Sequence, residues 1–114
     1  MHYRGCSGEN NRLPRTYHAG ETRDPGFVIN WLRRHYPRVP LCVVGFSLGG
    51  NMLLKLLGEQ ADSSVLCAAA AVSVPFDLAG CARRLEKGAS RLYQYWLLGA
   101  MKKTAYRKAC LLYT

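Results

Sequence analysis

The sequence predicts an α/β fold in which central parallel strands are flanked by helices. Residues 41–46 form a short apolar run rich in β-branched side chains, which is typical of a strand buried on both faces. From Leu48 the apolar residues change to helical spacing, and residues 65–74 form a second apolar run that Pro75 closes. A strand, a helix and a second strand in this order indicate a parallel, right-handed unit.

The junction between the first strand and the helix contains the most informative motif. Residues 45–49 read Gly-Phe-Ser-Leu-Gly and match G-x-S-x-G, which between a strand and a helix indicates a nucleophile elbow. We expect Ser47 at the apex of a strained turn, with Gly45 and Gly49 leaving space across it. The N–H of Leu48, in the first helical turn, is placed to bind an oxyanion. Ser47 is the candidate nucleophile and Leu48 the candidate backbone oxyanion donor; the alternative is an ordinary glycine-rich turn.

Helices are predicted before and after this unit. The first begins near Thr22 or Asp24, because Asp24 is a good N-cap and Pro25 suits the first helical position, and it ends at Pro37. Beyond the second strand, a short helix starts at Leu78 and a longer one follows residue 90. One face of the first helix is expected to be apolar: Phe27, Val28, Trp31, Leu32 and His35.

Composition indicates one small domain with a basic C-terminal part. The chain has 114 residues, of which 49% are hydrophobic, and a formal charge of +9. Residues 83–114 carry eight basic side chains against Glu86, a net charge of +7. Such a segment can bind nucleic acid or an anionic membrane surface, or it can be the solvated face of a helix. The solvated face is favoured, and no specific nucleic-acid partner is expected because no known pattern is present.

The cysteines indicate a cytoplasmic protein without a metal site. The five cysteines are odd in number and no C-x-x-C pair occurs, so we expect reduced thiols in the core, not a disulfide framework or a zinc site. The longest apolar stretch is too short and too rich in alanine to span a bilayer, so no membrane span is predicted.

Five blocks of sequence, in one order, resemble the α/β-hydrolase superfamily and within it the YheT-type branch of esterases. The blocks are residues 3–9 (YRGCSGE), 17–24 (YHAGETRD), 44–51 (VGFSLGGN), 74–78 (VPFDL) and 90–94 (SRLYQ). The resemblance extends over nearly the whole chain. It implies a partial α/β-hydrolase fold over residues 1–114, with an elbow-containing core at 1–77 and the start of a helical cap at 78–114.

The resemblance also implies a function. It suggests a carboxylic ester hydrolase, either a short- or medium-chain carboxylesterase or an enzyme like an acylglycerol lipase. Such an enzyme acts on small-molecule or lipid esters through an acyl-enzyme, without a metal or cofactor. Ser47 matches the nucleophile of the family motif, and the Leu48 amide matches one oxyanion donor.

The chain departs from the family pattern in its catalytic partners. In this superfamily the acid and the histidine follow the serine, but the three histidines here all precede Ser47. Asp77 follows Ser47 but stands at the start of the expected cap, so it is not assigned as the triad acid. A serine without a base is a weak nucleophile. We therefore expect the chain to be the middle of a larger enzyme and active only in the full-length parent.

Two alternatives stay open. In the first, the chain is a catalytically inactive fragment or a basic binding module that uses residues 83–114. In the second, the catalytic base is His18 or His35, outside the usual order of the triad. The last is the least favoured, because both residues precede the elbow. Steeply salt-dependent binding would favour the binding module, whereas Ser47-dependent esterase activity would favour the hydrolase.

Overall fold

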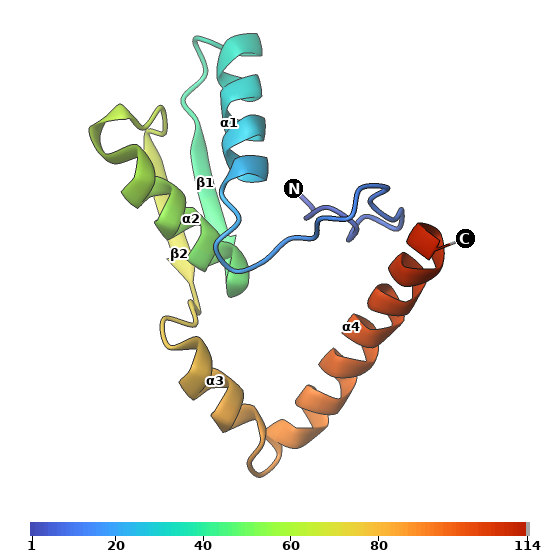
Figure 1. Cartoon of the computed structure of the whole chain (residues 1–114). Helices are drawn as coiled ribbons and strands as arrows, with labels where there is room; N and C mark the ends of the chain where they lie inside the picture. Colours follow the sequence, from blue (N-terminus) through green and yellow to red (C-terminus); the bar gives the residue numbers. More distant parts are fainter. Residues whose placement is uncertain (114) are drawn as a thin grey trace. The chain divides into compact units, whose positions relative to one another are not determined.

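The computed structural model describes residues 1–113, and their side chains as far as residue 111. The chain divides into two compact units (Figure 1): Met1 with residues 18–76, and residues 2–17 with residues 77 onward. In chain order the elements are α1 (Arg23–His35), β1 (Cys42–Phe46), α2 (Leu48–Gln60), the short 3₁₀ turn η1 (Ala61–Ser63), β2 (Ala68–Val72), α3 (Leu78–Leu85) and α4 (Ser90–Tyr113).

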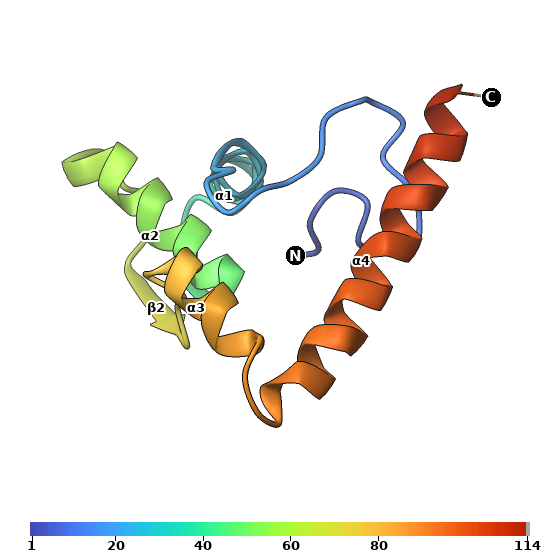
Figure 2. The same cartoon turned by 60° about the horizontal axis from the view of Figure 1, so that its bottom comes forward.

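The first unit is built on a two-stranded parallel sheet. β1 pairs with β2 in a register that runs from Cys42 opposite Ala68 to Phe46 opposite Val72. α2 connects the two strands and packs against both of them, and α1 packs against α2 (Figure 2). The predicted sequence of strand, helix and parallel strand is therefore confirmed, and the chain has an α/β fold with helices flanking parallel strands.

The core of this unit lies between α1, α2 and one face of the sheet. Its buried apolar side chains are Ile29 from α1 and Met52, Leu53 and Leu56 from α2. The expectation that the strands are buried on both faces is wrong for the described residues. Val44 and Phe46 are 56% and 66% exposed, because α2 covers only the other face of β1.

The predicted core position of the cysteines is also wrong. All five cysteines are exposed, so none of them lies in the core. Cys42 occupies the same side of β1 as Val44 and Phe46, since side chains two residues apart point to the same face of a strand. Cys67 precedes β2, whose five residues are all exposed.

The start of α1 is fixed by a buried carboxylate and not by the predicted Asp24 cap. Thr22 is the N-cap residue, and Glu21, which is only 3% exposed, accepts hydrogen bonds from the backbone N–H and the Nε of Arg23 at 3.1 and 2.9 Å. Glu21 thereby satisfies one of the free N–H groups of the first turn. Thr22 directs its hydroxyl to Glu59 of α2 at 2.6 Å, which ties the two helices together.

Glu59 should make the stability of this unit depend on pH. Hydrogen bonds from Lys55 Nζ (2.7 Å) and then from Thr22 Oγ1 (2.6 Å) lower the pKa of Glu59 below its ordinary value. A carboxyl whose pKa is lower in the folded state stabilises that state above the unfolded pKa, and the stabilisation is lost as the pH falls through the folded pKa. We expect Glu59→Gln to lower the melting temperature at pH 7, and the difference from the parent to close below about pH 4.

Thermal melts between pH 7 and pH 3 measure this difference. Lys55→Met is the companion variant, because it removes the first donor to the carboxylate while leaving Glu59 in place. It should reproduce part of the loss at pH 7. A difference between parent and Glu59→Gln that is the same at every pH would contradict this role for Glu59.

The second unit contains α3, α4 and the segment 2–17. Asp77 caps α3, where its Oδ1 accepts a hydrogen bond from the Gly80 N–H at 2.8 Å. Lys108 of α4 donates from Nζ to the carbonyl of Arg15 at 2.7 Å. No helix in the described part of the chain is both long enough and apolar enough to cross a membrane. The division into an elbow core at 1–77 and a cap at 78–114 stays a prediction.

Candidate active site

The candidate site is the sharp turn between β1 and α2. β1 ends at Phe46, Ser47 is the N-cap residue of α2, and the helix begins at Leu48. Ser47 has φ 50° and ψ −120°, a conformation that side-chain-bearing residues seldom adopt. The strain predicted for this position is therefore present in the backbone. It persists because the strand on one side and the helix on the other fix both ends of the turn.

Glycine at position 45 is required by the closeness of the chain across this turn. A Cβ on Gly45 would lie 2.6 Å from the carbonyl oxygen of Gly49 and 2.8 Å from the Cα of Gly50. Both neighbours are backbone atoms, which cannot rotate away as a side chain can. A Cβ on Gly50 would in turn lie 2.6 Å from Cγ2 of Val74. The first turn of α2 thus sits directly against β1 and against the residues that follow β2.

The hydroxyl of Ser47 is free for chemistry. Ser47 is exposed, and serine at an N-cap ordinarily accepts a hydrogen bond from the helix, but Ser47 makes no such capping bond. Its backbone is held on both sides: its N–H donates to Val72 at 2.8 Å, and its carbonyl accepts from Gly50 and Asn51 at 3.0 and 3.2 Å. A fixed backbone with an unoccupied Oγ suits a nucleophile.

Leu48, the candidate oxyanion donor, directly follows Ser47 and opens α2. Leu48 is the first residue of α2, and the first N–H groups of a helix have no carbonyl within the helix to bind. The helix dipole adds partial positive charge at the same place. A negative oxygen that forms next to Ser47 would therefore find a donor and a favourable field there.

Ser73 occupies the position after β2 that Ser47 occupies after β1, and sequence reasoning did not single it out. Phe46 pairs with Val72 at the end of the sheet, so Ser47 and Ser73 are the residues that follow the last pair of the two neighbouring strands. Ser73 is exposed and also has a positive φ, 52°. The available signal was positional: Ser73 ends the second apolar run just before Val74-Pro75, at the carboxyl ends of parallel strands, where ligands bind in such sheets.

The histidines and Asp77 have contacts of their own. His18 accepts through Nδ1 from the Gly20 N–H at 3.1 Å, and its Nε2 lies 3.9 Å from Oε2 of Glu21. His35 stacks on Trp31 with ring centroids 4.0 Å apart. None of these recorded contacts involves Ser47. Asp77 caps α3, with a guanidinium nitrogen of Arg83 3.8 Å from its Oδ2.

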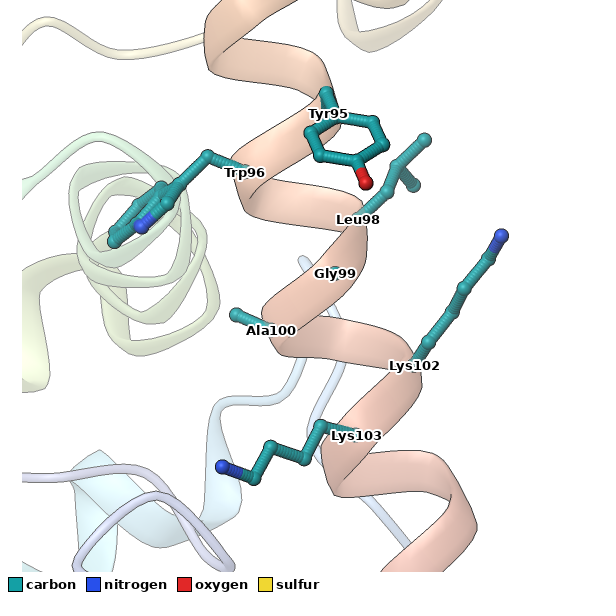
Figure 3. A pocket seen from close by; sticks show the side chains of 7 residues that line it. All are labelled: Tyr95, Trp96, Leu98, Gly99, Ala100, Lys102 and Lys103. Atoms are coloured by element: carbon teal, nitrogen blue, oxygen red, sulfur yellow. The ribbon is translucent and has the colours of Figure 1, made fainter.

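A surface hollow on α4 is separate from this chemistry. Tyr95, Leu98 and Lys102 project from one side of the helix and Trp96 and Lys103 from the other (Figure 3). Because every lining residue comes from the same helix, no second element closes this hollow, and its lining holds no serine, histidine or carboxylate. Within residues 1–113 no group of three or more histidine, cysteine or acidic residues is placed to hold a metal ion.

The chain is similar to several esterases and lipases. It is 49% identical over 108 residues to a protein of Escherichia coli (strain K12) named "Putative esterase YheT", covering 95% of this chain and 32% of that protein. It is 36% identical over 102 residues to human "Phospholipase ABHD3", covering 89% of this chain and 25% of that protein. A "Monoacylglycerol lipase" of Saccharomyces cerevisiae is 37% identical over 75 residues, 66% of this chain and 17% of that protein.

The chain thus spans about a third or less of the length of these relatives. No family model matches the chain. No solved structure matches it either. The similarity covers the β1–α2 junction and almost all of the surrounding sequence, and the two-stranded parallel sheet with its helices is consistent with part of the fold of these hydrolases. The chain belongs to the α/β-hydrolase superfamily.

Proposed function

We propose that this chain carries the nucleophile of a carboxylic ester hydrolase. The observation that carries the proposal is the strained, exposed Ser47, whose hydroxyl makes no capping bond, beside the N–H of Leu48. The names of the relatives support the reaction class, since they are an esterase, a phospholipase and a monoacylglycerol lipase. The substrate class is then short- or medium-chain carboxylic esters or acylglycerols.

The proposed reaction has two stages. Ser47 Oγ loses its proton to a base and attacks the ester carbonyl, while the Leu48 N–H binds the oxygen that becomes negative. The alcohol leaves with a proton, and an acyl-enzyme stays on Ser47. Water then attacks the acyl group with the help of the same base and releases the acid. The mechanism as proposed requires neither a metal ion nor a cofactor.

We propose that the base is a histidine outside these 114 residues. No histidine follows Ser47 in the sequence, and the recorded contacts of His18 and His35 lie within their own segments. Full activity therefore belongs to the full-length protein that contains this segment. A cytoplasmic location is part of the same proposal; it rests on the odd number and wide spacing of the cysteines.

An acyl-enzyme mechanism can be tested by its kinetics. When the full-length protein is mixed with a p-nitrophenyl ester, we expect a rapid release of nitrophenol, close to one equivalent per protein, before slower steady turnover. Purified protein that hydrolyses neither p-nitrophenyl esters nor acylglycerols would contradict the proposed function.

A second candidate function rests on the charge of α4. This helix carries five basic side chains and no acidic one, and among its described basic residues only Lys108 is not fully exposed. Residues 83–114 are then a basic binding surface for an acidic partner, and the chain itself is catalytically inactive. Binding that weakens steeply between about 50 and 200 mM salt would support this function. Binding that does not depend on salt would exclude it.

A further inference from the structure

We propose that Ser73 is a specificity residue of the Ser47 site, whose hydroxyl binds a hydroxyl group on the alcohol part of the ester. The preferred substrates are then esters of polyols, such as monoacylglycerols, over esters of simple alcohols. This inference rests on the proposed function. Ser47 and Leu48 act on the ester carbonyl, whereas Ser73 would select the alcohol part of the substrate.

The register of the sheet puts Ser47 and Ser73 each directly after the last residue pair of the two strands. Phe46 and Val72 form the last residue pair, and the Ser47 N–H donates to the Val72 carbonyl at 2.8 Å, so the pairing extends to the residues where both strands end. Neighbouring strands lie about 4.8 Å apart. On the proposal, an ester whose carbonyl carbon is in reach of Ser47 Oγ has a substituent on its alcohol side in reach of Ser73.

The chain beyond Ser73 stays against the helix of the nucleophile. The space at Gly50, in the first turn of α2, is filled by the side chain of Val74. One residue later, the carbonyl of Pro75 lies 3.5 Å from the side-chain nitrogen of Asn51. Val72, before Ser73, is paired with β1, and Val74 and Pro75, after it, contact α2. These contacts hold Ser73 at the edge of the same site.

Ser73 shares a positive φ with Ser47. Both serines have positive φ, 52° and 50°, and Ala61 is the third residue other than glycine with this property in the described chain. Glycine would adopt this conformation without strain. Strain of this kind clusters at functional sites, where it fixes the direction of a side chain. Ser73 is exposed and its hydroxyl makes no hydrogen bond within the described chain, so it can donate to and accept from a ligand.

A contact with substrate suits Ser73 better than a nucleophilic role. Ser47 is followed at once by the first turn of α2, whose N–H groups can bind an oxyanion. Ser73 is followed by Val74 and Pro75, and the next helix begins only at Leu78. Ser73 is therefore not followed directly by the helical N–H groups that follow Ser47. A neutral hydroxyl is a suitable partner for another neutral hydroxyl and gains nothing from a hydrocarbon acyl chain.

The test compares two esters with the same acyl group in the full-length protein: 1-decanoylglycerol, which has free hydroxyls, and methyl decanoate, which has none. Ser73→Ala should lower kcat/KM for the glycerol ester about tenfold, the size expected for one neutral hydrogen bond, and change the methyl ester less than about twofold. Ser73→Gly should lower the ratio of kcat/KM for the glycerol ester to kcat/KM for the methyl ester by the same factor. It should also raise the melting temperature, because glycine removes the backbone strain. It provides a folded variant if Ser73→Ala does not fold.

Ala61→Gly is the matched control, since it relieves the same kind of strain beyond the far end of α2. It should leave the ratio of the two esters unchanged. If the Ser73 variants lose the same activity on both esters, or lose none, the kcat/KM ratio is unchanged. That result would overturn the role of Ser73 but would not contradict the proposed esterase function. If the unsubstituted protein hydrolyses neither ester, the proposed function fails and this inference fails with it.

Discussion

Gly45→Ala is expected to destabilise the protein by about 3 kcal/mol and to abolish the function of the elbow. The added Cβ would lie 2.6 Å from the Gly49 carbonyl oxygen and 2.8 Å from the Gly49 carbonyl carbon. Real Cβ atoms do not approach that closely, so β1 and α2 must separate. Because both contacts are to backbone atoms, no change of rotamer relieves the clash.

Gly58→Ala is the matched control for this substitution. Gly58 lies in α2, the helix whose first turn faces Gly45, but a Cβ on Gly58 meets nothing within 4 Å. Alanine is the better helix former, so the control should be neutral or stabilise the protein by up to about 1 kcal/mol. Thermal and urea unfolding of the two variants measure the difference. A Gly45→Ala protein as stable as the parent would show that the turn is not as tight as described.

Ser47→Ala is expected to lower kcat/KM for ester hydrolysis roughly 10⁴-fold or more in the full-length protein. The substitution removes the atom that would form the acyl-enzyme, while the Leu48 N–H and the rest of the site stay in place. Folding should be retained, because Ser47 Oγ makes no capping bond and the side chain is exposed.

Ser63→Ala serves as the control serine in this experiment. Ser63 lies in η1, beyond the opposite end of α2, where its hydroxyl donates to the Gln60 carbonyl. Its removal should leave hydrolysis within about twofold of the parent. Initial rates with a p-nitrophenyl ester measure both variants. A Ser47→Ala protein that retains most of its activity would assign the nucleophile to another residue.

The sequence was sufficient to predict the elements around Ser47, because local patterns determine them. A β-branched run, a glycine on each side of the serine and helical spacing from Leu48 specify strand, turn and helix without help from distant residues. The structure has these elements at Cys42–Phe46 and Leu48–Gln60. The positive φ of Ser47 also follows from the motif, since a turn this sharp requires it.

Burial was harder to predict because it depends on which elements pack together. The expected apolar face of α1 included Phe27 and Trp31, but they are 65% and 40% exposed. The buried side of α1 is formed by Gly26 and Ile29, which are three residues apart. At Gly26 an added Cβ would be 3.5 Å from Leu56 of α2. The spacing of apolar residues indicates an amphipathic helix, but it does not identify which face a neighbouring element covers.

Ser73 illustrates the same limit at the candidate site. Its proximity to Ser47 depends on the pairing of Phe46 with Val72, and register between two strands separated by a helix cannot be read from either strand alone. The helix cap was missed for a related reason. Asp24 is a residue type that often caps helices. In the structure Glu21, three residues earlier, accepts hydrogen bonds from the backbone N–H and the guanidinium of Arg23 in the first turn instead.

Labelling with a fluorophosphonate, followed by intact mass measurement, tests the central claim most directly. We expect the full-length protein to gain one phosphonyl group, peptide mapping to place it on Ser47, and Ser47→Ala to gain none. The 114-residue chain alone, without a base in reach of Ser47, should stay unlabelled. Stoichiometric labelling that persists in Ser47→Ala, or that maps to another residue, would contradict the assignment of Ser47 as the nucleophile.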